Sequence, residues 1–175
     1  MNAAPPTLLC PRPVRAVLWG GLLCGALDIS AAFVVYGAMG LPPMRLLQGI
    51  ASGLLGRSAF AGGLPAALLG LFFEFVIATG AAAVYVMAGR FLGILTRRPW
   101  LAGPLYGIAV YWFMQLVVLP LSRYAHRRFS LRITLIGIAI HMVCVGLPIA
   151  LAARRFAAAK PASLTPDPCP LITDH

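Results

Sequence analysis

Four apolar runs, each long enough to cross a lipid bilayer, constrain this chain more than any other feature. They cover residues 16–39, 64–89, 100–121 and 131–153. A hydrocarbon core about 30 Å thick is crossed by about 20 helical residues. Inside lipid, a helix satisfies its own backbone hydrogen bonds, which an open strand does not. The sequence therefore predicts an all-α, polytopic bundle of four transmembrane spans in a single domain.

Composition supports a membrane protein and argues against nucleic acid as a partner. Of the 175 residues, 61% are hydrophobic and only 10% are charged, whereas soluble domains carry roughly 25% charged residues. The net charge is +10, but the basic residues flank the apolar runs, where they meet lipid headgroups. The expected partner is the lipid bilayer, and no nucleic acid is expected.

The segments between and around the runs are short. Pro42 and Pro43 interrupt the chain, and residues 43–57 then predict one amphipathic helix that is too short and too polar to span. Its apolar positions are Met44, Leu47, Ile50, Ala51 and Leu54, and its polar ones are Arg45, Gln48 and Ser52. This helix is expected at the interface or over the mouth of the bundle. A re-entrant segment at 42–58, or a bundle of three spans, are the alternatives.

The ends of the chain and one span carry proline signals. We expect an irregular N-terminal tail at 1–15 and a disordered C-terminal tail at 156–175, because both are rich in proline and the C-terminal one is polar. Pro120 is expected to loosen the last turn of the third span, because proline lacks an N–H group.

The distribution of basic residues predicts the orientation. With the N-terminus inside, the cytoplasmic flanks hold eight of them: Arg12, Arg15, Arg90, Arg97, Arg98, Arg154, Arg155 and Lys160. The opposite side holds six: Arg45, Arg57, Arg123, Arg127, Arg128 and Arg132. Cytoplasmic loops carry the excess of Lys and Arg, so both termini are expected in the cytoplasm. The load of Ala, Gly and Arg is typical of a GC-rich bacterial genome, which predicts the bacterial inner membrane.

Three ionisable residues lie near the middle of their spans. Asp28, Glu74 and His141 fall within about 4 Å of the predicted midplane at about 1.5 Å of rise per residue. Each shares its helix face with small residues, which line helix contacts in membranes. We therefore expect all three to point into the bundle, and Gln115 to join them from the third span. A charge in the bilayer core costs about 2.5–3.5 kcal/mol, so this polar cluster needs an explanation.

Three interpretations of the cluster remain open. It is polar glue, in which interhelical hydrogen bonds fix the packing of the helices. It is a pathway for protons or a small cation. It is a metal site whose candidate ligands are Asp28, Glu74 and His141, which suit iron, manganese or zinc in type.

Other functions receive less support from the sequence. There is no HExxH, GxSxG or P-loop motif, so we expect no enzyme activity, and no cofactor is predicted. The remaining hypothesis is a structural or accessory membrane subunit. Its small-residue faces, Gly21–Gly25 and Gly103–Gly107, would then serve packing or a homo-oligomer.

Several stretches resemble a family of uncharacterised bacterial inner-membrane proteins with four helices, distantly similar to the YagU-like group. The resemblance is carried by LQGIASGLLG at 47–56, LGL with Phe75 at 69–75, VVLPLS at 117–122, and HM with VGLPIAL at 141–151. It covers about residues 16–155. It implies a four-span membrane fold and supplies no activity or site residues.

Overall fold

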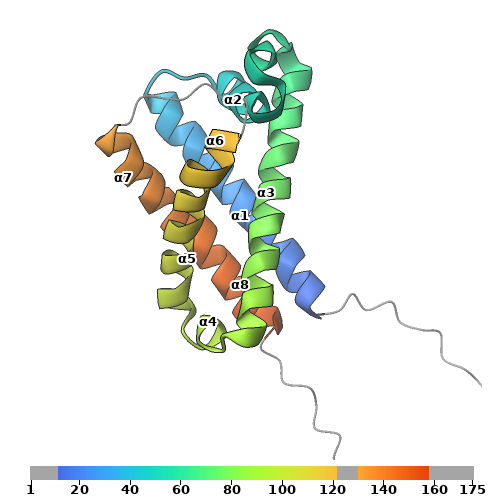
Figure 1. Cartoon of the computed structure of the whole chain (residues 1–175), viewed down its shortest axis with the longest axis vertical. Helices are drawn as coiled ribbons and strands as arrows, with labels where there is room; N and C mark the ends of the chain where they lie inside the picture. The colour runs from blue at the N-terminus through green and yellow to red at the C-terminus, as the bar shows by residue number, and fades with distance from the viewer. Residues whose placement is uncertain (1–11, 122–129, 158–175) are drawn as a thin grey trace, which may run out of the picture.

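The computed structural model describes residues 12–121 and 130–157. In these residues every regular element is a helix. Four of the described helices are long and apolar enough to cross a membrane: Pro13–Ala38, Gly63–Phe91, Pro99–Leu121 and Leu131–Phe156. The prediction of an all-α, multi-pass bundle with four spans is therefore confirmed (Figure 1).

The four spans are built from more than four elements. The first two are α1 (Arg12–Ala38) and α3 (Gly63–Phe91), and between them lie α2 (Pro43–Leu55) and the 3₁₀ segment η1 (Gly56–Ala61). A short α4 (Ile94–Arg97) precedes the third span, which comprises α5 (Pro99–Phe113), η2 (Met114–Val118) and α6 (Leu119–Leu121). The fourth comprises α7 (Leu131–Ile140), η3 (His141–Gly146) and α8 (Leu147–Ala157).

The elements divide between the two ends of the bundle. The start of α1, the end of α8 and α4 lie together at one end, which we call the α4 end (Figure 1). The other end, which we call the α2 end, carries α2, α6 and the start of α7. Both ends of the described chain therefore lie on the same side of the bundle, as four spans require.

Helix ends differ from the sequence prediction in three places. The first helix begins at Arg12, so residues 12–15 are not irregular; Pro13 fits the first turn, where its missing N–H costs nothing. The segment between the second and third apolar runs, residues 90–99, contains the helix α4. The last helix continues to Ala157. The rest of the predicted tails, and the loop after Leu121, lie outside the described residues.

Two helix segments, η2 and η3, have widened π-type turns. The N–H groups of Leu119 and Leu147 bond to the carbonyls of Met114 and Met142, five residues earlier. A proline follows each leucine directly. Because proline has no N–H and its ring collides with the carbonyl four residues back, a wider turn accommodates it. The loosening expected near Pro120 is therefore present, and the fourth span repeats it.

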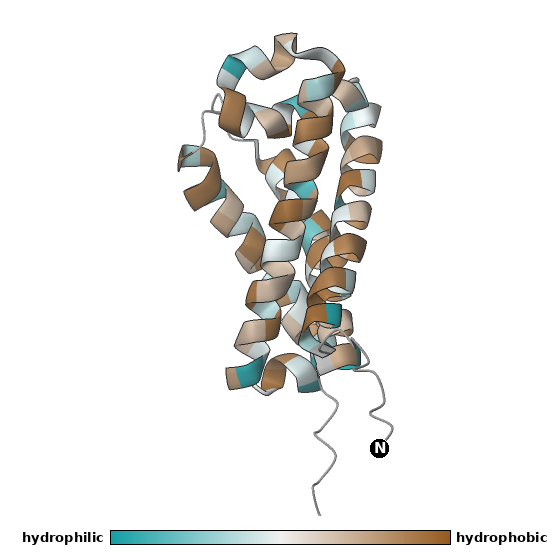
Figure 2. Ribbon diagram, turned by 90° about the vertical axis from the view of Figure 1, so that its right-hand side faces the viewer, coloured by the Kyte–Doolittle hydropathy of each residue, from teal (hydrophilic) through white to brown (hydrophobic). Residues whose placement is uncertain are grey.

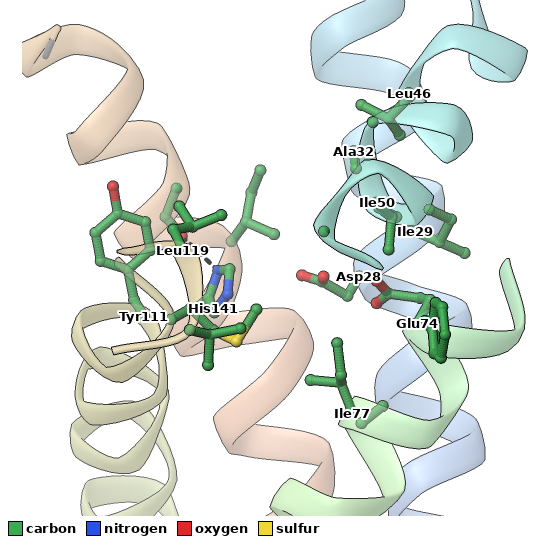
Figure 3. Close-up of a pocket in the computed structure, with 18 of the residues that line it drawn as sticks. Asp28, Ile29, Ala32, Leu46, Ile50, Glu74, Ile77, Tyr111, Leu119 and His141 are labelled. Carbon is green, nitrogen blue, oxygen red and sulfur yellow. Dashed lines mark hydrogen bonds between the residues drawn. The ribbon is translucent and has the colours of Figure 1, made fainter. Parts of the chain in front are cut away.

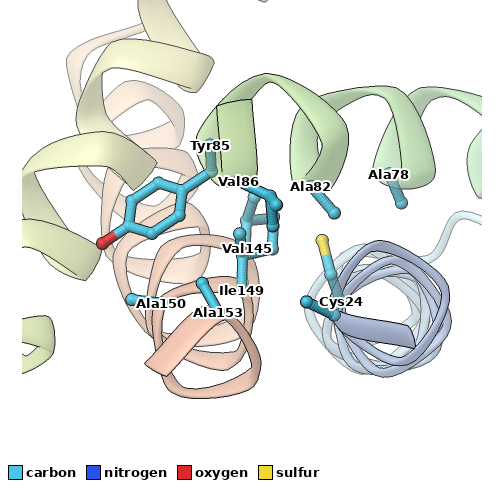
Figure 4. Close-up of a cluster of buried hydrophobic side chains, with 10 residues drawn as sticks. Cys24, Ala78, Ala82, Tyr85, Val86, Val145, Ile149, Ala150 and Ala153 are labelled. Carbon is cyan, nitrogen blue, oxygen red and sulfur yellow. The ribbon is translucent and has the colours of Figure 1, made fainter. Parts of the chain in front are cut away.

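A dense core fills the half of the bundle nearest the α4 end, which we call the closed half. It contains ten buried residues, most of them small: Ala16, Cys24, Ala78, Ala82, Tyr85, Val86, Val145, Ile149, Ala150 and Ala153 (Figure 4). Tyr85 is fully buried, and its hydroxyl donates to the carbonyl of Leu95 at 2.9 Å. Its ring packs edge-on against Tyr106 at 4.9 Å between centroids. Small side chains thus let three spans close around one aromatic ring.

Large apolar side chains cover the outside of the spans. Leu105, Leu116, Leu135 and Val84 are all more than half exposed in the single chain. Hydrophobic residues run along the length of the bundle, as Figure 2 shows. A surface of this kind suits contact with lipid tails.

The short helix α2 buries part of its polar face against the bundle. Gln48 and Ser52 are buried at 2% and 1% exposure, together with Ala51, whereas Met44 and Leu54 are exposed. The amide of Gln48 donates to the carbonyl of Gly63 at 3.0 Å, and the Ser52 hydroxyl donates within α2 to the carbonyl of Gly49. Gln48 thus satisfies a backbone group at the start of α3.

Candidate functional site: an acidic cavity

The half of the bundle nearest the α2 end contains a cavity of about 970 Å³, partly open to the outside. We call this the open half. Residues of α1, α2 and α3 form one wall, and residues of α5, η2, α7 and η3 form the other. Figure 3 shows the two walls facing each other across the cavity. Cys24 and Ala78, from the closed core, contribute to its lining, so the cavity ends where the dense core begins.

Asp28 and Glu74 meet on the first wall. Asp28 projects from α1 and Glu74 from α3, and their carboxyl groups lie beside one another at the edge of the cavity (Figure 3). Glycines bring the two helices together: a Cβ on Gly21 would lie 2.7 Å from Cα of Thr79, and one on Gly25 would lie 2.8 Å from the ring of Phe75. The sequence therefore places the two carboxyl groups side by side through close helix packing.

The closeness of the two carboxyl groups has a chemical consequence. Two carboxylates side by side in an apolar cavity repel each other, and one proton held between them removes that repulsion. Neither Asp28 nor Glu74 has a salt-bridge partner among the described residues, so no fixed cation there offsets the repulsion.

His141 lies on the opposite wall. Its Nδ1 is 2.9 Å from the carbonyl oxygen of Gly137, one turn earlier in the same span. Because a carbonyl only accepts, Nδ1 carries the proton, and Nε2 is the acceptor of the neutral ring. The imidazole also packs edge-on against Tyr111 at 5.3 Å between centroids. Tyr111 and the backbone contact between Gly107 and His141 hold the ring in place.

Gln115 belongs to the same wall as His141. Its amide nitrogen donates to the hydroxyl of Tyr111 at 2.9 Å, so Tyr111 links Gln115 to the imidazole ring. The predicted polar residues therefore all line the cavity but form two groups. Asp28 and Glu74 make one group, and His141 with Gln115 makes the other, across the cavity.

This division bears on the metal hypothesis. A metal site needs several ligands close together, usually at about 2.0–2.6 Å from the ion. Within the described ranges, no three His, Cys, Asp or Glu side chains are grouped closely enough to hold a metal ion. Asp28, Glu74 and His141 thus do not form a single ligand sphere in this arrangement.

Two further residues of the site were not recognised in the sequence. Tyr111 was not assigned a role of its own, although it contacts both His141 and Gln115. Arg45 of α2 lines the cavity; its guanidinium donates to the carbonyl of Phe60 at 3.3 Å and lies 5.9 Å from the centre of that ring. The polar face of α2 was the available signal for Arg45, since that face turns toward the bundle.

The small-residue faces suggested for a homo-oligomer are occupied within the chain. Gly21 and Gly25 face α3, and Gly103 and Gly107 face η3 and the start of α8. A Cβ on Gly103 would lie 3.0 Å from the carbonyl oxygen of Gly146. These faces therefore pack the chain against itself, and the expectation that a second copy uses them is not supported.

Comparison with known proteins finds no matching family model, curated protein or solved structure. The resemblance to the YagU-like group gains no support from these comparisons. The site is therefore interpreted from its own geometry.

Proposed function

We propose that this protein moves protons, or a small cation in exchange for protons, across the membrane through the acidic cavity. The observation that carries the proposal is the adjacent pair of carboxyl groups, Asp28 and Glu74, on the wall of an accessible cavity (Figure 3). Ionisable residues inside a membrane bundle commonly mark ion or proton pathways. A pair that holds one proton is a group that takes up and releases that proton.

The opposite wall supplies groups suited to the same task. His141 has one nitrogen engaged by Gly137, which leaves the other as a proton acceptor. Gln115 and Tyr111 add a hydrogen-bonded pair on that wall. Water or a cation inside the cavity would connect the two walls, whose polar groups are separated by open space (Figure 3).

The rival function is purely structural, and the cavity favours transport over it. Polar glue predicts that the carboxyl groups bond to His141 and close the bundle around them. Among the described residues, His141 instead bonds to its own helix, and the carboxyl pair faces a cavity. Hydrogen bonds in membrane bundles stabilise by only about 0.6 kcal/mol on average. This is less than the cost of about 2.5–3.5 kcal/mol for a charged side chain in the bilayer core.

Proton flux into liposomes tests the proposal. The full chain is reconstituted with an internal pH dye, and a potassium diffusion potential drives uptake. We expect flux above that of empty liposomes, and loss of most of it in Glu74→Gln and in Asp28→Asn. Each amide keeps the size of the carboxyl group but does not ionise, so it cannot take up and release a proton.

The matched control is Ser30→Ala. Ser30 lies two residues from Asp28, is exposed, and bonds only to the carbonyl of Ala26 in its own helix. Its loss should leave the flux unchanged. Equal flux in empty and protein-containing liposomes would contradict proton movement and favour the structural role. Equal flux in the wild type and both amide variants would show that the carboxyl pair is not the pathway.

We further propose that the chain resides in a bacterial inner membrane with both termini in the cytoplasm. Arg97 and Arg98 lie at the end of α4, and Arg154 and Arg155 lie in the last turn of α8. These two elements meet at the α4 end (Figure 1), and basic residues favour the cytoplasmic side. Reporter fusions that are active only in the cytoplasm, placed at the C-terminus or after Phe60, test this. We expect a signal from the C-terminal fusion only, and the reverse result would invert the orientation.

A further inference from the structure

The acidic cavity is much larger than a bare ion requires. A water molecule takes up about 30 Å³ in the liquid, so a space of about 970 Å³ exceeds the needs of a proton or a metal ion many times over. Pockets for organic ligands measure roughly 300–1,000 Å³. The size of the cavity therefore indicates a molecule with many atoms.

The lining of the cavity is apolar apart from a few polar groups. Apolar and aromatic side chains come from both walls: Ile29, Ile50, Phe73, Ile77, Val110 and Met114. Organic-ligand sites typically combine such a lining with a small number of placed polar groups. The occupant should therefore present an apolar body to most of the cavity.

The charges in the lining indicate the sign of the charge that the ligand carries. Asp28 and Glu74 adjoin one another and lack a basic partner in the described ranges. Arg45 is the basic residue of the described lining, and its guanidinium is engaged by the ring and the carbonyl of Phe60 on the α2 side. An uncompensated acidic pair in an apolar cavity is complementary to a positive charge.

We propose that the cavity binds an organic cation with an apolar body, and that its positive charge sits against the Asp28–Glu74 pair. This inference rests on the proposed function and names the substrate class. On binding, the proton shared by the two carboxyl groups leaves to water, and the ligand cation takes its place. One positive charge enters the site and one leaves, so the exchange is balanced without any further reactant.

The opposite wall contains two interruptions of the regular helix. Residues of η2 and η3 contribute to it, and both segments have widened turns. Such turns are frequent at functional sites.

Equilibrium dialysis of the detergent-purified full chain tests the inference, with tetraphenylphosphonium as the probe. Tetraphenylborate, which has almost the same shape and the opposite charge, is the matched ligand control. We expect saturable binding of the phosphonium, one proton released per cation bound, and no saturable binding of the borate. Binding should weaken by about tenfold or more in Asp28→Asn and Glu74→Gln, because a charged partner is lost, and should be unchanged in Ser30→Ala.

Two results would overturn the inference. Saturable binding of both ions to the wild type would show that apolar surface alone captures them. This comparison uses only the wild-type protein, so it does not depend on the folding of any variant. Phosphonium binding that is undiminished in folded amide variants would place the ion elsewhere. The two proposals can also be contradicted separately. Carboxyl-dependent phosphonium binding without proton flux would support the binding site and contradict transport. Proton flux without phosphonium binding would support transport and contradict this substrate class.

Discussion

The same helices pack closely in the closed half of this bundle and separate around a cavity in the open half. Near the α4 end, α1, α3 and α8 approach each other through small side chains, and Tyr85 of α3 points away from α1 and packs against Tyr106 of α5 (Figure 4). Near the α2 end, the same spans separate around a cavity that contains Asp28 and Glu74. The acidic residues thus lie just beyond the point where the packing ends.

This difference indicates that the closed half contributes most to folding stability and that the open half contains the chemically active groups. In the closed half, tyrosine hydroxyls bond to backbone carbonyls: Tyr85 to Leu95 in the next segment, and Tyr106 to Ala81 in the neighbouring span. In the open half, the carboxyl groups of Asp28 and Glu74 lie beside each other and face the cavity. Substitutions in the closed half should therefore cost stability, and substitutions of the carboxyl pair should cost function.

The largest effect is expected from Gly146→Leu, which attacks the closest helix contact. A Cβ at Gly146 would collide with the carbonyl of Gly103, and backbone atoms cannot move aside as a flexible side chain does. We expect the free energy of unfolding to fall by about 3 kcal/mol, which is a large effect for overpacking. Size-exclusion chromatography after heating should show this as a large drop in thermal stability. The control is Gly80→Ala, because Gly80 has open space around its Cα; a comparable drop there would contradict the account.

Next in size is Gly70→Leu, which separates α2 from α3. A Cβ at Gly70 would meet the carbonyl of Leu47, so this is a tight contact within the open half. We expect α2 to detach at a cost of about 2 kcal/mol while the closed half stays folded. Limited proteolysis should then cut between Leu41 and Gly62. Loss of the whole bundle in one step would show that the two halves are not separable.

A smaller effect is expected from Tyr85→Phe in the closed half. This change removes the hydrogen bond to Leu95 and leaves that carbonyl without its partner. The expected loss is about 1 kcal/mol, measured as unfolding by denaturant in mixed micelles. An unchanged unfolding curve would mean that this bond does not tie α3 to the segment around α4.

The smallest effect is expected from the same substitution in the open half, Tyr111→Phe. Tyr111 is also buried, at 5% exposure, but its hydroxyl accepts a hydrogen bond from the exposed Gln115. Freed of that bond, Gln115 finds other partners, so the loss should stay below about 0.6 kcal/mol. A larger loss than in Tyr85→Phe would reverse the proposed contrast between the halves.

Much of the fold could be predicted from sequence, because lipid imposes one simple requirement. Four long apolar runs have to be helices, and the small residues beside Asp28 and Glu74 correctly indicated inward-facing sides. The widened turn near Pro120 also followed from the chemistry of proline. These features depend on local sequence alone.

The features that sequence did not reveal depend on contacts between distant segments. Nothing local distinguishes the polar face of α2, with Gln48 buried, from a face turned to headgroups. Likewise, depth and a shared small-residue face grouped His141 with the two acidic residues, although it lies across the cavity from them (Figure 3). Depth fixes one coordinate of a side chain, and helix rotation and separation fix the others.

The most direct test of the account is whether water reaches the acidic cavity. Val76 and Ile77 are neighbours on α3 at nearly the same depth, with 49% and 38% exposure in the chain. Ile77 lines the cavity beside Glu74 and Val76 does not. Each is changed to cysteine in a chain whose native cysteines are alanine, and the reconstituted protein is treated with a water-soluble, cationic methanethiosulfonate.

The account predicts rapid modification of the cysteine at position 77 and little at position 76, because position 76 would be covered by lipid. Saturating tetraphenylphosphonium should slow the reaction at position 77. Equal reactivity at the two positions, or none at either, would contradict a water-accessible acidic cavity in this bundle.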